Sequence, residues 1–248
     1  MPRFFVPSEN VNDRQIRITG SDASHIMRSL RMAKGEKLTV CDMHSTEYEC
    51  VIQGFEGTDV LLDVMNKSVG RTEPPYKAML FQALPKGDKM ELIIQKAVET
   101  GAYAIVPFIS ERCISRPDAK SAKGKLERWN KIALEAAKQC GRGIIPEVLP
   151  ICSFDEAVRM ASDADAPILF YEGDGVRSLK SVLSDVKLNE NEPITVSAMI
   201  GAEGGFAKSE VEKAFESGLV PTGLGNRILR CETAGIVALS AISYALEL

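Results

Sequence analysis

The chain has 248 residues, of which 45% are hydrophobic and 26% are charged, and its formal net charge at pH 7 is −4. This length fits one large domain or a medium domain joined to a small one, and the apolar content is enough for a packed core. Because the sequence has no run of 18 apolar residues and no apolar stretch near its start, we expect neither a membrane-spanning helix nor a secretory signal.

The cysteines and histidines form no pattern typical of metal binding. None of the six cysteines belongs to a C-x-x-C pair, and the two histidines, His25 and His44, stand far apart. Scattered single cysteines are typical of reduced thiols in the cytoplasm, where each is a small buried side chain. We therefore expect a cytoplasmic protein without a metal site.

Basic side chains are concentrated in two segments of this acidic protein. Residues 1–37 carry seven basic and four acidic side chains, and residues 112–142 carry nine basic and three acidic ones. Such segments can bind a polyanion locally even when the net charge is negative. The alternative is a solvated, charged face, and the sequence leaves both interpretations open.

The first 70 residues predict a small β unit. Short β-branched runs punctuated by Gly and Asp predict three strands, at 37–42, 47–55 and 59–69. A helix is expected over 21–32, with Ser21 or Asp22 as its N-cap. Its apolar face would carry Ile26, Met27 and Leu30, and its other face His25, Arg28 and Arg31.

After a linker rich in Gly and Pro at 69–77, strands and helices alternate. The predicted strands are 76–84, 102–110, 167–173 and 194–201, and the predicted helices are 88–101, 124–141, one starting at Ser153, 178–186, 209–218 and 232–248. Capping pairs are predicted at Asp88 and Glu91, Ser153 and Glu156, and Ser209 and Glu212, with Gly101 at a C′ position. The alternation predicts an α/β domain with a mostly parallel sheet. The last helix is apolar nearly all round, so we expect it to be buried, in part by a partner chain.

A glycine-rich turn, IGAEGGF at 200–206, follows the strand predicted at 194–201. Such a turn lets a ligand approach the backbone closely. Its glycines do not match G-x-G-x-x-G, no G-K-[ST] follows, and Glu203 disfavours a phosphate, so a dinucleotide or phosphate site is not favoured. A carboxylate in the turn better suits a cationic or hydrogen-donating ligand, although a tight loop alone would also explain the glycines.

IGAEGGF followed by LGNRILRCETA at 224–234 resembles the paired C-terminal motifs of SPOUT methyltransferases. Within that superfamily the whole chain is similar to the RsmE family, through five stretches in the same order: MPRFF, HIMRSLRMAKGE, ALPKGDKMELIIQKAVETGAYAIVPF, KLERWNKIALEAAKQCGRGIIPEV and the two motifs. The resemblance implies a small PUA-like β-barrel that binds RNA at 1–72. It also implies a SPOUT-type α/β domain with a C-terminal trefoil knot at 73–248, with the knotted cofactor site at about 194–234. Thr100, Ala202 and Cys231 stand where the family usually has Leu, Pro and Thr.

The resemblance implies methylation of N3 of a uridine in 16S ribosomal RNA of the assembled small subunit, with S-adenosylmethionine as cofactor. It also implies a homodimer formed through the knot and the C-terminal helix. The cofactor would lie against the strand end at 169–172, the glycine turn and the 224–234 loop. The cofactor-binding residues would be Leu169, Glu172, Ile200, Gly201, Glu203, Gly204, Gly205, Leu224, Gly225, Leu229, Thr233 and Ala234.

The chemistry requires removal of the N3 proton and stabilisation of charge on the uracil carbonyls. Arg230, inside the cofactor loop, is the candidate for the second task, and a salt bridge to Glu203 or Glu232 is its structural alternative. Glu232 is a candidate base, although a helix N-terminus would keep its pKa low, and loss of the proton to solvent is equally open. The candidate RNA-binding residues are Arg3, His25, Arg28 and Arg31 in the first domain, and Lys86, Arg112, Lys125, Arg128, Gln139 and Arg142 in the second.

Three other functions remain as alternatives. A SPOUT ribose 2′-O-methyltransferase would share the cofactor site but not HIMRSLRMAKGE. A non-enzymatic RNA-binding or ribosome-assembly factor would keep the basic segments and would not need the glycine turn. A nucleotide-binding oxidoreductase is disfavoured by the glycine spacing.

Overall fold

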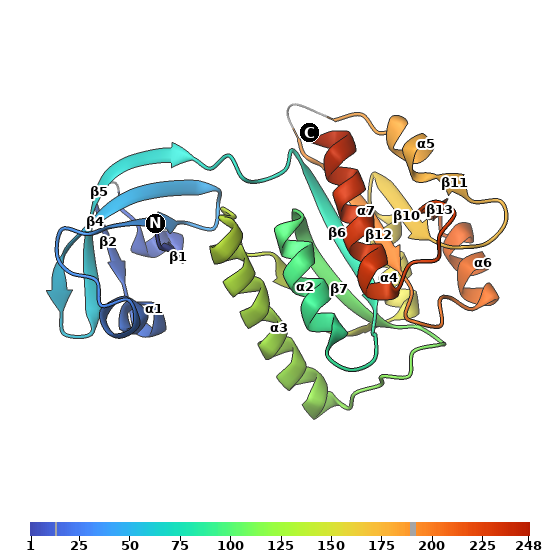
Figure 1. The fold of residues 1–248 in the computed structure, drawn as a ribbon, viewed down its shortest axis with the longest axis horizontal. Helices are drawn as coiled ribbons and strands as arrows, with labels where there is room; N and C mark the ends of the chain where they lie inside the picture. Colours follow the sequence, from blue (N-terminus) through green and yellow to red (C-terminus); the bar gives the residue numbers. More distant parts are fainter. Residues whose placement is uncertain (13, 189–191) are drawn as a thin grey trace. The chain divides into compact units, whose positions relative to one another are not determined.

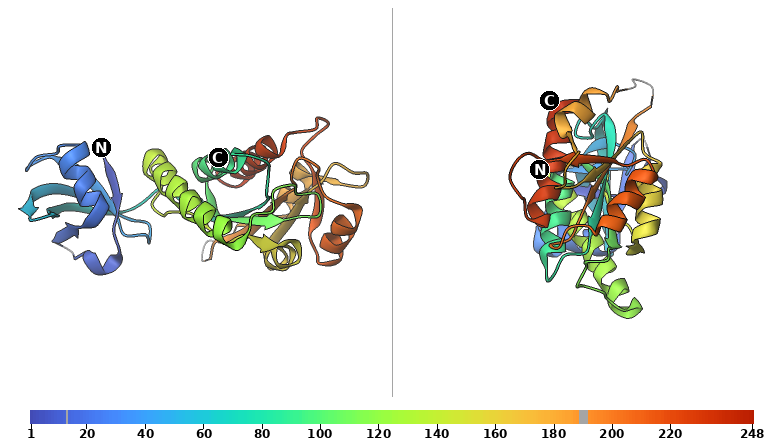
Figure 2. Two further views of the ribbon diagram at one scale, coloured as in Figure 1. Left: turned by 90° about the horizontal axis from the view of Figure 1, so that it is seen from below. Right: turned by 90° about the vertical axis from the view of Figure 1, so that its right-hand side faces the viewer.

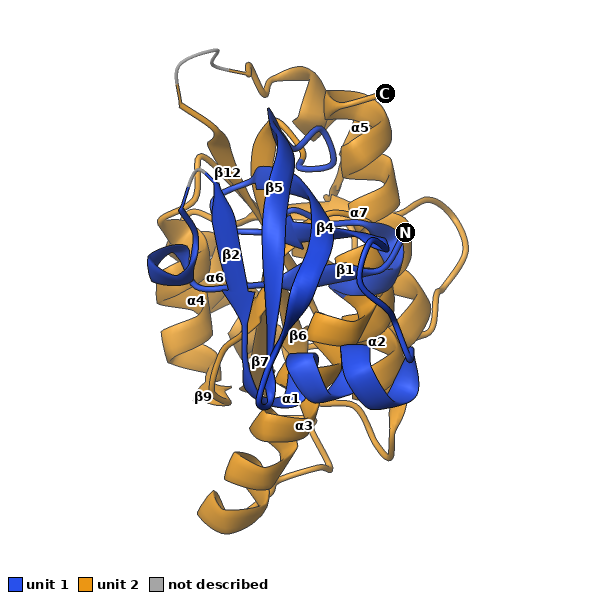
Figure 3. Ribbon diagram, turned by 90° about the vertical axis from the view of Figure 1, so that its left-hand side faces the viewer, with its two compact units in different colours: residues 1–73, 137–145 blue, residues 74–136, 146–248 orange. Residues whose placement is uncertain are grey.

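This computed structural model describes residues 1–12, 14–188 and 192–248. The chain folds into two compact units, coloured separately in Figure 3: residues 1–73 with 137–145, and residues 74–136 with 146–248. The division at 73/74 lies one residue from the predicted 72/73 boundary. Residues 137–145, which the prediction assigned to the second domain together with Gln139 and Arg142, group with the first compact unit.

Glu73 explains why 137–145 groups with the first unit. Its carboxylate accepts hydrogen bonds from the Arg142 guanidinium at 2.6 and 3.0 Å and from the backbone amides of Gly143 and Ile144. Arg142 is buried, at 4% exposed, so both charges of the pair are largely removed from water. A charge buried this way requires its partner, which fixes the segment to Glu73.

The first unit contains a five-stranded sheet with the order β1-β3-β4-β5-β2. Its strands are β1 (Arg3–Phe5), β2 (Gln15–Ile18), β3 (Lys37–Cys41), β4 (Thr46–Glu56) and β5 (Asp59–Val69). β1 pairs in parallel with β3, and the other pairs are antiparallel. The three longer strands were predicted from their β-branched runs, whereas β1 and β2 were not.

The helix predicted over 21–32 is instead a short α-helix, α1 (Gly20–Ser24), followed by one π-helical turn, η2 (His25–Ser29). The amide of Leu30 bonds to the carbonyl of His25 at 2.9 Å, the wider i→i+5 spacing. This turn leaves Leu30 41% exposed rather than on the apolar face. Thr19, not Ser21 or Asp22, is the N-cap, and Arg31 leaves the helix in a left-handed conformation with φ 52°.

The second unit is built on a sheet with the order β11-β13-β10-β12-β6-β7-β8, with β9 also pairing to β7. Every pair in it is parallel, as predicted. Its strands are β6 (Tyr76–Ala83), β7 (Ala102–Ile109), β8 (Glu147–Val148), β9 (Cys152–Ser153), β10 (Ala166–Phe170), β11 (Arg177–Ser178), β12 (Ile194–Ile200) and β13 (Val220–Gly223). The unpredicted strands β8, β9, β11 and β13 have two to four residues, too few to show a periodic pattern.

Helices cover both faces of this sheet, as Figures 1 and 2 show. α2 and α7 lie side by side on one face, and α4 and α6 lie on the other. Residues 196–200 of β12, at the centre, are all buried, as is usual for a parallel strand covered on both sides. The helices are α2 (Lys89–Glu99), α3 (Ala119–Cys140), α4 (Phe154–Ser162), α5 (Leu179–Ser184), α6 (Lys208–Glu216) and α7 (Cys231–Leu246). Among the described residues, no helix has the length and apolar character needed to cross a membrane.

The helix ends test the predicted capping residues. Ser153 and Glu156 form a complete capping box at α4, and Gly101 follows α2 with φ 88°, so both predictions are confirmed. The prediction of a capping box at α2 was wrong. The Asp88 side chain accepts no capping hydrogen bond, and Glu91 instead pairs with Arg128 at 2.7 Å. α6 begins one residue before Ser209, with Glu210 accepting a hydrogen bond from the amide of Ala207 at 2.9 Å.

Candidate functional site

A pocket of about 970 Å³ lies in the second unit, where the chain leaves several parallel strands. Its walls are the segments that follow β10 (Phe170–Gly173), β12 (Ile200–Phe206) and β13 (Thr222–Arg230), with Lys89 and Arg112 after β6 and β7. Ligands of parallel α/β sheets bind outside the carboxyl ends of the strands. The sheet order brings these ends together, although the segments are far apart in sequence.

A backbone hydrogen bond closes the glycine turn. The amide of Gly205 bonds to the carbonyl of Ala202 at 2.9 Å, and Gly205 adopts φ 63°. A Cβ at Gly201 would lie 3.1 Å from the backbone of Gly205, so any larger residue there would push the two sides of the turn slightly apart. Arg112 donates a hydrogen bond to the carbonyl of Gly204 at 2.9 Å, which holds the turn from the β7 side.

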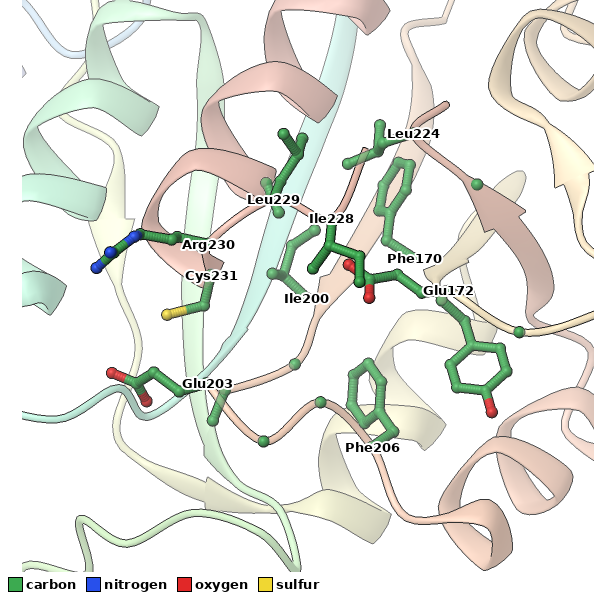
Figure 4. Close-up of a pocket in the computed structure, with 18 of the residues that line it drawn as sticks. Phe170, Glu172, Ile200, Glu203, Phe206, Leu224, Ile228, Leu229, Arg230 and Cys231 are labelled. Carbon is green, nitrogen blue, oxygen red and sulfur yellow. The ribbon is translucent and has the colours of Figure 1, made fainter. Parts of the chain in front are cut away.

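Apolar side chains form one wall of the pocket. Figure 4 shows Phe170, Ile200, Leu224, Ile228 and Leu229 gathered there. Phe206, on the other side of the glycine turn, is stacked on Phe108 with ring centroids 6.3 Å apart and also contacts Phe154. The turn therefore rests on a packed aromatic cluster, so its position is set by the core.

The start of α7 forms a polar edge of the pocket. Arg230 is the N-cap, and Arg230, Cys231 and Ala234 line the pocket. No hydrogen bond or ion pair engages the Arg230 guanidinium anywhere in the described part of the chain, so its predicted structural alternative, a salt bridge to Glu203 or Glu232, is absent there.

Lys89 pairs with both of those carboxylates. Its Nζ lies 2.9 Å from Oε1 of Glu203 and 3.2 Å from Oε2 of Glu232. The backbone amide of Lys86 adds a hydrogen bond of 3.1 Å to Glu203. Burial raises the pKa of Glu203, but Lys89 and the backbone amides outweigh burial and hold this pKa below its usual range. Both carboxylates are therefore charged and engaged at neutral pH.

Glu172 is the pocket carboxylate without such a partner. It is exposed, it lines the pocket, and no residue that the structure describes forms a hydrogen bond or ion pair with it. Figure 4 shows its carboxylate beside Ile228, over the apolar wall.

Cys231 stands where its neighbours keep it protonated. Burial raises the pKa of its thiol to about 12, with further contributions from the hydrogen bond to Glu232 and the charge of Glu203. The thiol donates to Oε2 of Glu232 at 3.2 Å. At neutral pH it is therefore a neutral donor and no nucleophile.

Ten of the twelve predicted cofactor residues line the pocket, and Leu169 and Thr233 do not. Leu169 is fully buried within β10, and the next residue, Phe170, reaches the pocket instead. Thr233 is exposed in the first turn of α7, on a different side of the helix from Cys231 and Ala234. In both cases the side chain points away from the pocket, so any contact of these two residues with a cofactor stays a prediction.

Glu232, the candidate base, does not line the pocket. Its pKa is held below its usual range, first by its own backbone amide at the helix start and then by the Cys231 thiol and Lys89. This geometry argues against Glu232 as a base.

The predicted RNA-binding residues differ in exposure. Arg142 is buried against Glu73, so its side chain is not accessible to RNA in this structure. Arg3 pairs with Glu47 at 2.9 Å, and its side chain is 15% exposed. Arg128 pairs with Glu91 but stays 64% exposed, and Lys125 lies over the ring of Trp129 at 5.9 Å. The side chains that remain exposed are His25, Arg28, Arg31, Lys86, Arg112 and Gln139.

Several pocket residues were not named individually as cofactor contacts. Phe170, Tyr171 and Ala202 lie inside two of the predicted stretches, whereas Lys89, Gly173, Val176, Lys208, Thr222 and Gly223 lie outside all three. Asn226 to Ile228 lie inside the 224–234 motif and could have been included with it. Lys89 carries no local signal, because its partners are more than 100 residues away. No group of three or more His, Cys, Asp or Glu side chains among the described residues could hold a metal ion.

Comparison with known proteins identifies the family. A family model described as an RNA methyltransferase domain matches residues 72–243, and one described as an RNA methyltransferase PUA domain matches residues 18–63. The chain is 38% identical over 231 residues to the ribosomal RNA small subunit methyltransferase E of Bacillus subtilis strain 168, covering 93% of this chain and 90% of that protein. The chain belongs to this RNA methyltransferase family.

Two solved methyltransferase structures resemble the chain closely. A putative methyltransferase from Legionella pneumophila, solved with bound S-adenosylmethionine, is 30% identical with a TM-score of 0.83. The ribosomal RNA small subunit methyltransferase E of Neisseria gonorrhoeae, also bound to S-adenosylmethionine, is 32% identical with a TM-score of 0.80. Each covers 98% of this chain and 97% of its own, so the likeness includes both units.

Proposed function

We propose that this enzyme uses S-adenosylmethionine to methylate N3 of a uridine in 16S ribosomal RNA, acting on the assembled small subunit. The observation that carries the proposal is the likeness, over nearly the whole chain, to the small-subunit methyltransferase E of Neisseria gonorrhoeae solved with that cofactor. The pocket at the carboxyl ends of β10, β12 and β13 supports it, because its residues suit the chemical groups of the cofactor.

The pocket fits S-adenosylmethionine in shape and chemistry. Its apolar wall of Phe170, Ile200, Leu224, Ile228 and Leu229 suits a flat adenine ring, and the glycine turn lets the ligand approach the backbone. Glu172 is suited to accept hydrogen bonds from ribose hydroxyls, since Glu203 is already engaged by Lys86 and Lys89. When bound, this cofactor supplies an electrophilic methyl group.

Arg230 is proposed to stabilise the negative charge that develops on the uracil carbonyls when N3 loses its proton. It lies at the edge of the pocket and is not engaged by a carboxylate in the described chain. A fixed cation aimed at a developing charge lowers the barrier without reorganisation. The proton itself is proposed to leave to solvent, since the lowered pKa of Glu232, held by its backbone amide, Cys231 and Lys89, makes this carboxylate a weak base.

RNA contacts are proposed for the exposed cations of both units. His25, Arg28 and Arg31 form a group at the π-helical turn of the first unit, and Lys86 and Arg112 belong to loops beside the pocket of the second. Phosphate contacts of this kind position the RNA and carry little sequence information. N3 is on the pairing edge, so the target base must be unpaired or drawn out of its stack.

The finer features of the architecture are part of this proposal. A trefoil knot at about 194–234 is supported by the path of the chain, which leaves β12, forms β13 on the far side of β10, and returns to pack α7 on α2. We further propose that the first unit closes as a PUA-like barrel and that the enzyme is a cytoplasmic homodimer formed through the knot and α7.

The test is methyl transfer to small ribosomal subunits taken from cells that lack the modification. After incubation with S-adenosylmethionine, nucleoside mass spectrometry identifies the product and primer extension locates it, because N3 methylation blocks the pairing edge. We expect a single N3-methyluridine. A ribose-methylated nucleoside would instead assign the protein to a 2′-O-methyltransferase. Absence of both transfer and cofactor binding would favour a ribosome-assembly factor.

A further inference from the structure

Lys89 joins three segments that meet at the pocket edge. From the first turn of α2, its Nζ bridges Glu203 of the glycine turn and Glu232 of the first turn of α7, at 2.9 and 3.2 Å. The three side chains are 31%, 30% and 17% exposed, so solvent screens this network only in part. One cation therefore serves two carboxylates, which leaves the group with a net charge of −1.

Arg230, next to this network in the chain, pairs with neither carboxylate. It immediately precedes Cys231 and Glu232, and Figure 4 shows its side chain extending to the same side of the pocket as Glu203. The thiol of Cys231 contacts Glu232 and is influenced by the charge of Glu203. Carboxylates so placed are natural partners for a guanidinium, because arginine and carboxylate form strong, bidentate hydrogen bonds.

We propose that Lys89 is a positioning residue: by holding Glu203 and Glu232, it prevents both carboxylates from capturing Arg230 and so keeps that guanidinium available to the RNA base. The inference rests on the proposed function, in which Arg230 stabilises charge on the uracil. In this inference Lys89 contacts neither the RNA base nor the transferred methyl group. Loss of Lys89 would remove the cation that bridges the two carboxylates, and Arg230, directly before Cys231 and Glu232 in the chain, is proposed to turn toward them.

The first experiment replaces Lys89 by Met and measures methyl transfer at saturating S-adenosylmethionine and small subunits. We expect kcat to fall about tenfold or more, because Arg230 would be drawn away from the base. The dissociation constant for S-adenosylmethionine, from calorimetry, should change by less than about threefold, since Lys89 is proposed to act on the RNA side. Lys89→Arg should retain most of the turnover, because a guanidinium can also bridge two carboxylates.

Lys96→Met is the matched control. Lys96 lies on the same helix and also pairs with a carboxylate, Glu99, at 2.8 Å, but it does not line the pocket. This variant should turn over like the unmodified enzyme. Thermal unfolding of all variants shows whether each is folded at the assay temperature.

The decisive variant removes the carboxylates as well. In Lys89→Met/Glu203→Gln/Glu232→Gln the two carboxylates that Lys89 holds are gone, so they cannot capture Arg230 and turnover should recover to within about threefold of the wild-type enzyme. In an Arg230→Ala background, Lys89→Met should cause no further loss. Failure of the triple variant to recover, or additive losses in the Arg230→Ala background, would overturn the inference and make Lys89 a structural residue.

A measurement without RNA separates this inference from the proposed function. The rate at which phenylglyoxal modifies Arg230, followed by peptide mass spectrometry, reports whether its guanidinium is free. We expect the rate to fall several-fold in Lys89→Met and to return in the triple variant, and an unchanged rate would overturn the inference. The phenylglyoxal rates could change as expected while the wild-type enzyme methylates no small subunits. In that case Lys89 does keep Arg230 free, and the proposed RNA substrate is wrong.

Discussion

Glycine is favoured at two positions of the turn after β12, for two different reasons. Gly205 has φ 63°, a conformation that L side chains rarely adopt, although an added Cβ there would meet no atom within 4 Å. At Gly201 the backbone is ordinary, but a Cβ would press on the Gly205 backbone at 3.1 Å. One glycine is therefore needed for its conformation and the other for clearance.

Gly205→Ala should weaken cofactor binding through this conformational strain. We expect a loss of about 1–2 kcal/mol in stability and about tenfold or more in affinity for S-adenosylmethionine, because the turn must change its backbone angles. Urea denaturation and calorimetry measure the two effects.

Gly218→Ala is the matched control for that variant. Gly218 also has a positive φ, 95°, and an open Cβ position, but it follows α6 and does not line the pocket. It should lose similar stability and keep its cofactor affinity. Equal loss of affinity in both variants would show that global destabilisation, and not the turn, decides binding.

At the scale of elements, helix starts show which local signals were reliable. Ser153 and Glu156 form a capping box because both groups are exposed and meet no competitor. At α2 the same spacing fails, since Arg128 on another helix takes Glu91. A capping pattern therefore holds only where no distant side chain offers a better partner.

Ser153→Ala should lower the free energy of unfolding by about 1 kcal/mol, because one amide at the start of α4 loses its acceptor. Ser162→Ala, at the other end of α4, removes only a hydroxyl that bonds back to the carbonyl of Arg159 at 2.8 Å. That variant should stay within about 0.5 kcal/mol of the unmodified protein. Chemical denaturation compares them, and the prediction fails if the two losses are equal.

For the whole molecule, the exposed apolar side chains of α7 bear on the proposed dimer. Val237 and Tyr244 are 37% and 77% exposed, and their spacing of seven puts them on one face of the helix. Leu92, on the neighbouring helix α2, is 45% exposed. Exposed apolar side chains on two neighbouring helices are what the proposed contact with a second copy of the chain would cover.

Tyr244→Asp should dissociate that dimer, because a charge would be buried at its interface. Light scattering should give twice the chain mass of 27.0 kDa for the unmodified protein and the single mass for the variant. Phe215→Asp, on α6 and 65% exposed, is the control and should remain dimeric. A dimer that survives Tyr244→Asp and is lost in Phe215→Asp would place the interface elsewhere.

Three buried thiols and one partly buried thiol make the stability of the protein depend on pH in the alkaline range. Burial raises the pKa of Cys41 and Cys152 to about 11 and of Cys50 and Cys231 to about 12, from an ordinary 9.0. The thiols of the unfolded chain lose their protons at a lower pH than those of the folded chain. The stability that the protonated thiols contribute is therefore fully present below pH 9 and is lost as the pH rises toward 11 and 12.

The free energy of unfolding should therefore decline above about pH 9, and Cys50→Ala should show a shallower decline. Cys50 is the simplest case, because burial is the only cause of its shift. Urea denaturation of both proteins between pH 8 and pH 10.5 makes the comparison. An identical decline in the two proteins would mean that other groups cause it.

The sequence by itself determined what local patterns can encode. Period and propensity are properties of neighbouring residues, so the longer strands, the parallel sheet, the helices, the glycine turn and most of the pocket residues could be predicted. Short strands such as β11 and β13, and the π-helical turn at His25–Ser29, carry too little local pattern to be read.

The tertiary structure decided which side chains meet. The sheet order brings Lys89 to Glu203, 114 residues away, and a pairing with Glu73 buries Arg142. It also turns Leu169 into the core and Phe170 toward the pocket. Such contacts depend on long-range packing and on competition between partners, and no local pattern carries that information.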